Sequence, residues 1–150
     1  MKIEELIKST KPLDIEKRVV LNILVTQNCI ADKFNEILKP YDLSSEQYNV
    51  LRILRGQNGK AVNMCLLQER MIAKTSNTTR LVDKLLLKNL VTREVCPSNR
   101  RKMEIEITQK GLDVLHELEP KVRHQETSLA QNLTSDELQI LNQLLEKYRN

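Results

Sequence analysis

Two polar segments in the middle of the chain carry side chains that suit contacts with a nucleic acid. The first, residues 75–88, reads as a helix with a tip rich in hydroxyl and amide groups. Its candidate contact residues are Thr75, Ser76, Asn77, Thr79, Arg80 and Lys84. The second is a short basic turn whose candidates are Asn99, Arg100, Arg101 and Lys102. Polar groups at a helix N-terminus can contact phosphates and base edges, and arginine can hydrogen-bond guanine through two donors. Together, the helix could enter a DNA major groove, and the basic turn could contact the neighbouring phosphate backbone. The alternatives are a solvated helix face and a basic turn that only aids solubility.

The charge distribution supports a polyanion site in the same part of the chain. The 150 residues carry a formal net charge of +4, which alone decides little. Residues 70–102 contain nine basic and two acidic residues, a net charge of +7, whereas the remainder carries 15 basic and 18 acidic residues, a net charge of −3. A basic segment on a slightly acidic protein indicates a localised site for a polyanion.

Other chemistry finds little support. The hydroxyl-rich run 75–79 has no neighbouring histidine base and no nucleophile elbow, and the sequence contains no phosphate-binding glycine loop or metal motif. His116 and His124 are expected on a helix surface. We therefore expect neither an enzyme nor a cofactor or metal. Because the sequence shows no signal segment and no apolar run near the roughly 20 residues of a membrane span, we expect a cytoplasmic protein that does not bind membranes.

The three cysteines form no pattern typical of disulfides or zinc sites. Cys29 and Cys65 are expected to pack in the interior. Cys96, at the base of the basic turn, is the candidate for an exposed redox-active thiol. A cysteine-based redox sensor is therefore one alternative function. A module that binds protein through its apolar helices, without binding DNA, is another.

Apolar periodicity predicts a mainly helical, α+β fold. A long amphipathic helix is expected over residues 14–39, and a capping box begins the next helix at Ser44. Two short helices follow over residues 63–71 and 75–88, with Thr75 as the second N-cap. The turn of about three residues between them is typical of a helix-turn-helix.

The helix at 75–88 should have two distinct faces. Its packing side carries Thr78, Leu81, Val82 and Leu85, and its outer side carries Ser76, Arg80, Asp83 and Lys84. Alternating residues then predict a β-hairpin over 91–107. Thr108 should cap a long helix that Pro120 kinks or interrupts, and Thr134 opens the last helix with a capping box.

The helices at the two ends of the chain imply a second copy. Within the terminal segments 14–39 and 112–149, an apolar stripe over residues 14–39 and another over 137–148 are more than one small lobe over residues 44–108 can cover. Terminal helices interleaved between two chains would cover both stripes, so a homodimer is expected. Such a dimer would place two recognition helices about one DNA turn apart.

This arrangement resembles the MarR family of bacterial winged helix-turn-helix regulators over nearly the whole chain. Residues 76–85 read Ser-Asn-Thr-Thr-Arg-Leu-Val-Asp-Lys-Leu, close to the family's small-x-x-Thr-Arg-Leu-Val-Asp-Arg-Leu. Residues 96–101 read Cys-Pro-Ser-Asn-Arg-Arg where the family has Asp-x-x-Asp-Arg-Arg. Residues 107–111 read Ile-Thr-Gln-Lys-Gly where it has Leu-Thr-x-x-Gly. The spacing between these motifs matches without a gap.

The resemblance implies one MarR-like domain over residues 1–150, with a DNA-binding lobe at 44–108 and dimerisation helices on either side. Its partners would be double-stranded DNA, a second copy and a small-molecule effector. It implies a repressor of a pseudo-palindromic promoter site, relieved by a ligand or oxidant, whose wing at about 91–107 reaches the minor groove. Tyr41 and Tyr48 are candidates for lining the family's effector pocket.

Four departures from the family pattern concern the wing and the turns. Asn99 stands where an aspartate usually holds a wing arginine, and Cys96 replaces a second acid. Asn89 replaces the usual glycine after the recognition helix, and asparagine tolerates a left-handed cap. Ile72 replaces a glycine in the helix-turn-helix, where a β-branched residue resists positive φ, so this turn is expected to differ.

Overall fold

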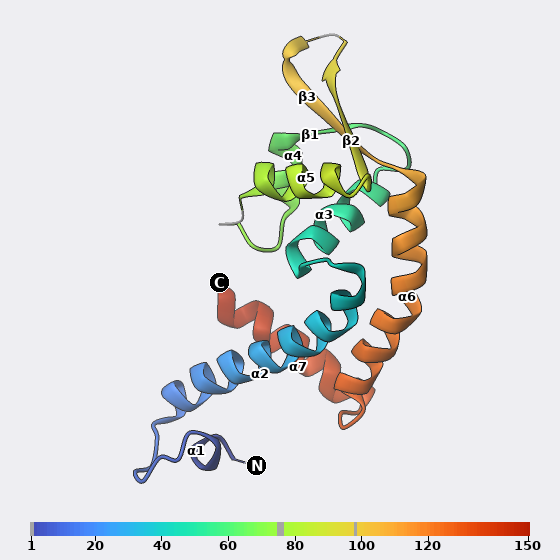
Figure 1. Ribbon diagram of the computed structural model, residues 1–150. Helices are drawn as coiled ribbons and strands as arrows, with labels where there is room; N and C mark the ends of the chain where they lie inside the picture. The colour runs from blue at the N-terminus through green and yellow to red at the C-terminus, as the bar shows by residue number, and fades with distance from the viewer. Residues whose placement is uncertain (1, 75–76, 98) are drawn as a thin grey trace.

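The computed structural model describes residues 2–74, 77–97 and 99–150. In chain order its elements are α1 (Ile3–Leu6), α2 (Ile15–Leu38), the 3-10 helix η1 (Lys39–Tyr41), α3 (Ser45–Arg55), β1 (Val62–Asn63), α4 (Met64–Arg70), α5 (Thr78–Leu87), β2 (Val91–Cys96), β3 (Asn99–Ile107), α6 (Gln109–Ala130) and α7 (Ser135–Arg149). Figure 1 shows α1, α2 and α7 at one end of the molecule and α3, α4, α5 and the strands at the other, with α6 joining the two. The expected fold, a winged helix-turn-helix lobe flanked by terminal helices, is confirmed.

Side-chain caps begin the helices where the sequence predicts them. The Ser44 hydroxyl accepts from the Gln47 N–H at 3.2 Å, while the Gln47 side chain accepts from the Ser44 N–H at 3.0 Å. Thr134 and Glu137 form the same capping box before α7, and Thr108 caps α6. Each box satisfies N–H groups that lack partners within the helix.

Pro120 does not interrupt α6, contrary to one of the expected outcomes. The helix runs from Gln109 to Ala130 with the proline inside it. Leu118 and Val122, on either side of Pro120, are both buried. Because both halves of the helix pack on the same core, the loss of one backbone donor at the proline is not enough to end the helix.

The predicted boundary between the two short helices is wrong. α5 begins at Thr78, and its N-cap is Asn77, whose side-chain oxygen accepts from the Arg80 N–H at 3.1 Å. The connection from α4 therefore spans residues 71–77 and not about three residues. Thr75, the predicted cap, lies outside the described residues. The side chain of Gln68 on α4 contacts residues on both sides of the start of α5. Its amide donates to the Lys74 carbonyl at 2.7 Å, and its oxygen accepts from the Thr78 hydroxyl.

The sheet has the antiparallel order β1-β3-β2. The predicted hairpin is confirmed, with Val91 opposite Ile107, but the sequence analysis missed β1, where Val62 pairs with Ile105. Strand β2 ends at Cys96, and β3 begins at Asn99. Residues 99–102 therefore belong to strand β3, which corrects the prediction that they form a basic turn.

The core of the DNA-binding lobe lies between α3, α5, the sheet and α6. Its fully buried side chains include Leu51 from α3, Val82 and Leu85 from α5, Ile105 from β3, and Leu115 and Leu118 from α6. Leu38, at the end of α2, is buried in the same cluster. The recognition helix is thus held by packing on one side, and the end of α2 is anchored beside it.

The terminal helices leave apolar side chains exposed in the single chain. The large exposed ones are Ile15, Val20, Leu24 and Ile30 on α2, and Leu138, Ile140, Leu141, Leu144 and Tyr148 on α7. No residue of α7 is buried. A monomer rarely exposes contiguous apolar patches of this extent.

Among the residues that the structure describes, none of the helices has the length and apolar character required for a membrane span.

Candidate nucleic-acid interface

The recognition helix α5 presents the two faces that the sequence predicts. Thr78, Val82 and Leu85 are buried against the core, and Leu81 is partly buried. Thr79, Arg80, Asp83 and Lys84 are exposed. Of the remaining predicted contact residues on this helix, Asn77 is exposed but is the N-cap, while Ser76 and Thr75 lie outside the described residues.

The cations on the exposed face of α5 differ in how they are bound. The Arg93 guanidinium on β2 contacts the Asp83 carboxylate at 2.6 Å, so this acidic group is paired with the wing strand. Arg80 and Lys84 have no carboxylate partner within salt-bridge distance among the described residues. Arg80 and Lys84 therefore remain available for an external anion. The Asp83–Arg93 pair, which the sequence analysis missed, ties the recognition helix to the wing.

A hollow of about 370 Å³ lies between α4, α5 and the strands. Thr79 and Arg93 line it together with Lys102 and Met103 of β3. The structure therefore brings Thr79 from the helix and Lys102 from the wing, both predicted contact residues, to one concave surface. A cationic, open hollow of this kind suits a phosphate or another anion.

The wing candidates lie on strand β3. Asn99 and Lys102 are exposed, and Asn99 pairs with Cys96 beside a register shift in β2. The backbones of Arg100 and Arg101 belong to β3, but their side chains lie outside the described part of the structure. Their predicted role in the minor groove stays a prediction.

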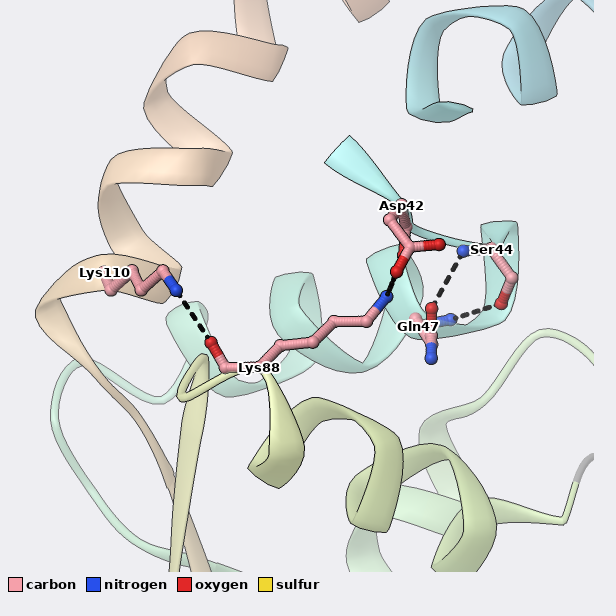
Figure 2. A network of polar contacts seen from close by, with 5 residues as sticks. All are labelled: Asp42, Ser44, Gln47, Lys88 and Lys110. Carbon is pink, nitrogen blue, oxygen red and sulfur yellow. Dashed lines mark hydrogen bonds and ion pairs between the residues drawn. The ribbon is translucent and has the colours of Figure 1, made fainter. Parts of the chain in front are cut away.

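The recognition helix ends at Lys88 and Asn89. Asn89 adopts φ 58°, the left-handed cap expected for it, and the Leu90 N–H donates to the Leu85 carbonyl at 3.0 Å. The Lys88 ammonium contacts the Asp42 carboxylate at 2.9 Å (Figure 2). By its place in the sequence Lys88 could be a phosphate neighbour or a plain surface residue, whereas the structure pairs it with Asp42 of the same chain.

Two large apolar side chains of the helix-turn-helix, Ile72 and Leu87, are exposed. The side chain of Ile72 is 84% exposed, and Ile72 is not among the described residues with positive φ. Because Ile72 does not adopt a left-handed conformation, its β-branched side chain fits this turn without backbone strain. Leu87 is also 84% exposed and lines a hollow of about 590 Å³ with Lys84 and Lys88.

The two tyrosines proposed for an effector pocket differ in their surroundings. Tyr48 is buried in the core, and burial raises the pKa of its phenol. Tyr41 is partly exposed and bonded to α6: its hydroxyl donates to the Glu117 carboxylate at 3.1 Å and accepts from the Lys121 ammonium at 2.6 Å. Tyr48 therefore acts in packing, whereas Tyr41 connects η1 to α6.

The expected burial of the cysteines is reversed. Cys29 and Cys65 are exposed and Cys96 is buried. The register shift between Val95 and Cys96 leaves Val95 exposed and turns Cys96 inward, which the alternation of the strand could not predict. Within the described residues, no three histidine, cysteine or acidic side chains gather in a way that could hold a metal.

Comparison with known proteins gives consistent matches. A family model described as MarR family matches residues 43–103. The multiple antibiotic resistance protein MarR of Escherichia coli is 31% identical over 116 residues, which cover 75% of this chain and 78% of that protein. The structure of a MarR transcription factor from Planctomyces limnophilus is similar with a TM-score of 0.70 at 31% identity, over 91% of this chain and 98% of that one. A mutant Escherichia coli MarR complexed with operator DNA gives a TM-score of 0.76 at 25% identity, over 91% and 99%.

Proposed function

Because the chain belongs to the MarR family of transcriptional regulators, we propose that it binds operator DNA through α5 and the wing. Its recognition helix enters a major groove, and the hairpin β2–β3 reaches the neighbouring minor groove. The observation that carries this proposal is the exposed face of α5, where Arg80 and Lys84 have no internal carboxylate partner among the described residues. An operator complex of the similar Escherichia coli protein supports the same mode of binding.

The division of labour on this surface follows from the chemistry of each side chain. Arg80 can read a guanine edge through two donors, whereas Thr79 and Lys84 suit phosphate oxygens. Lys102, with Arg100 and Arg101, supplies the basic wing, and a narrow minor groove attracts such cations through its enhanced negative potential. Together these residues would fix register through the backbone and sequence through the major groove.

The working form is a homodimer on a pseudo-palindromic site. The exposed apolar faces of α2 and α7 would be covered by the same helices of a second copy, and two-fold symmetry would set the two α5 helices one DNA turn apart. We infer a repressor that a small ligand or an oxidant releases by changing the separation of the two lobes. Tyr41, bonded to Glu117 and Lys121 where the terminal helices meet the DNA-binding lobe, is placed to sense such a change.

The proposed function also implies where the protein acts and that it is not an enzyme. A regulator that acts by binding chromosomal DNA works in the cytoplasm. It also needs no catalytic group, and the site described above is explained by contacts to DNA without a reaction.

The substitution Arg80→Ala tests the base-reading role. The matched control Arg123→Ala removes the same side chain from an exposed position in the second half of α6. Affinity is measured by fluorescence anisotropy with an operator duplex selected from a random pool and with a random duplex. We expect Arg80→Ala to weaken operator binding by roughly 10- to 100-fold, as for one lost bidentate contact, and random DNA only slightly. Equal losses on both duplexes, or an equal loss in the control, would refute a base-reading role.

A further inference from the structure

The end of the recognition helix is joined to the junction between α2 and α3 by a single side chain. Lys88, the residue after α5, extends its ammonium to Asp42, which lies between η1 and α3. The ammonium contacts the Asp42 carboxylate at 2.9 Å and also donates to the Asp42 carbonyl oxygen. The hydrogen bond from Lys88 lowers the pKa of the Asp42 carboxyl group, so the acid stays charged at neutral pH.

Asp42 is held in a fixed conformation where it meets Lys88. It adopts φ 51°, and its N–H donates to the Lys39 carbonyl at 3.0 Å. The Leu43 N–H donates to the carbonyl of Leu38, the last residue of α2, at 3.3 Å. The next residue, Ser44, begins the capping box of α3 (Figure 2). The position of Asp42 therefore follows the end of α2 and the start of α3 together.

The opposite side of the same helix end is held by α6. The Lys110 ammonium donates to the Lys88 carbonyl at 2.9 Å (Figure 2), and the Thr108 hydroxyl donates to the Asn89 carbonyl at 2.8 Å. Lys88 thus lies between Asp42, in the segment that joins α2 to α3, and Lys110 at the start of α6. In Figure 1, α2 and α6 both lead from this lobe to the end of the molecule where α7 lies.

From this geometry we propose that Lys88 is a positioning residue that fixes the direction of the recognition helix relative to the dimerisation helices. The inference rests on the proposed function, since it concerns how the two recognition helices of a dimer are spaced. The Lys88–Asp42 bridge resists rotation of α5 about its packed face. Its loss would let each recognition helix, still tied to the wing by Asp83 and Arg93, adopt a wider range of angles relative to the dimerisation helices, so the dimer would tolerate half-sites at a wrong separation.

This role and a phosphate contact predict opposite effects of charge. If Lys88 only attracts phosphates, removing its charge weakens all DNA, and removing the Asp42 charge strengthens all DNA. If the bridge positions α5, removing either charge relaxes the preference for half-site spacing in the same direction. Asparagine suits position 42 because it tolerates left-handed backbone, and Lys88→Arg keeps a cation able to reach Asp42.

The test compares wild type, Lys88→Met, Asp42→Asn and Lys88→Arg on three duplexes. These are the operator selected from a random pool, the same operator with one base pair inserted at its centre, and a random duplex. The measured quantity is the ratio of the dissociation constants for the inserted and the original operator. We expect Lys88→Met to lower this ratio about 4-fold, as two exposed ion pairs of about 2-fold each would give. Asp42→Asn should lower it less, because it keeps a neutral acceptor, and Lys88→Arg should leave it unchanged.

Three outcomes would contradict this scheme, and they can be told apart. A wild type that binds the operator no better than random DNA would overturn the proposed function, and the inference with it. Wild-type discrimination that survives in both Lys88→Met and Asp42→Asn would overturn only the inference. Uniform weakening by Lys88→Met with uniform strengthening by Asp42→Asn would assign Lys88 to phosphate binding. Thermal melting of each variant confirms that the compared proteins are folded.

Discussion

Replacing Gly111 with alanine tests how closely α6 packs on the end of the recognition helix. A Cβ at Gly111 would lie 2.4 Å from the Leu90 carbonyl oxygen and 2.7 Å from Cγ1 of Ile107. Non-bonded heavy atoms pack favourably at about 3.5 Å or more, so the first contact is about 1 Å too short. The contacted Leu90 atom is a backbone carbonyl oxygen, two residues after the C-cap Lys88 of α5, and it cannot turn aside as a flexible side chain can.

The expected loss of stability in Gly111→Ala follows from the backbone shift that relieves the clash at Leu90. The same Leu90 oxygen accepts from the Thr108 N–H at 3.1 Å, so relieving the clash stretches that hydrogen bond. Overpacking typically costs about 1–3 kcal/mol, and a weakened hydrogen bond adds about 1 kcal/mol. We therefore expect Gly111→Ala to lower the free energy of unfolding by about 2–4 kcal/mol.

Gly56→Ala is the matched control for Gly111→Ala. At Gly56 an added Cβ would meet carbonyl oxygens at 3.4 and 3.5 Å, and φ is −64°. Alanine there should be neutral or should stabilise by up to about 1 kcal/mol, by restricting the unfolded chain. Urea denaturation followed by circular dichroism, at one protein concentration, measures both variants. Equal shifts in the two, or a Gly111→Ala midpoint at or above that of wild type, would show that the α6 contact is not tight.

Two further predictions concern the terminal helices. Leu144, 58% exposed in the single chain, should lie in the dimer interface, so Leu144→Asp should give the monomer mass in sedimentation equilibrium with an unchanged helical spectrum; a persisting dimer would remove α7 from the interface. Thr134→Ala should destabilise by about 1 kcal/mol at pH 7, as a lost threonine cap does. The N–H of Thr134 bonds to the Glu137 carboxylate at 2.8 Å and lowers its pKa. The stabilisation from the charged Glu137 carboxylate is therefore fully present above the pKa of this group in the unfolded chain. It is lost as pH falls through the lowered pKa of Glu137 in the folded protein. Thr134→Ala also removes the bond from the Thr134 hydroxyl to the Glu137 carboxylate at 3.0 Å, whereas the lost bond from the Glu137 N–H to that hydroxyl does not depend on the carboxylate charge. The gap between the urea midpoints of variant and wild type should thus narrow, without closing, as pH falls through the lowered pKa of Glu137; a gap that stays constant in acid would argue against a role for the Glu137 charge.

Helices with strong local signals were predictable from the sequence. α3 and α7 begin at capping boxes that involve only residues three apart, and α2 has a sustained apolar stripe. The start of α5 could not be predicted from the sequence, because Thr75 and Asn77 are both good N-caps by residue type. The contact between Thr78 and Gln68 sets Thr78 at the start of the helix, and that contact crosses between two helices.

Features that depend on pairing between distant segments were also missed. β1 is two residues long and has no periodicity of its own, so it exists only because β3 offers Val62 a partner. The inward turn of Cys96 depends on a register shift in the hairpin, and strict alternation gives the wrong side after any such shift. The Lys88–Asp42 bridge joins residues 46 apart, and composition gave no sign of it.

These internal pairs change how the charge of the recognition region should be interpreted. Its net charge of +7 would suggest a large number of phosphate contacts if every cation faced DNA. Arg93 and Lys88 are instead paired with Asp83 and Asp42. Arg80, Lys84 and Lys102 are exposed without a carboxylate partner in the described part of the chain. Because counterion release scales with the phosphates that are neutralised, the unpaired cations should set affinity and its salt dependence. The paired ones hold the helix and the wing in the geometry that lets those contacts form together.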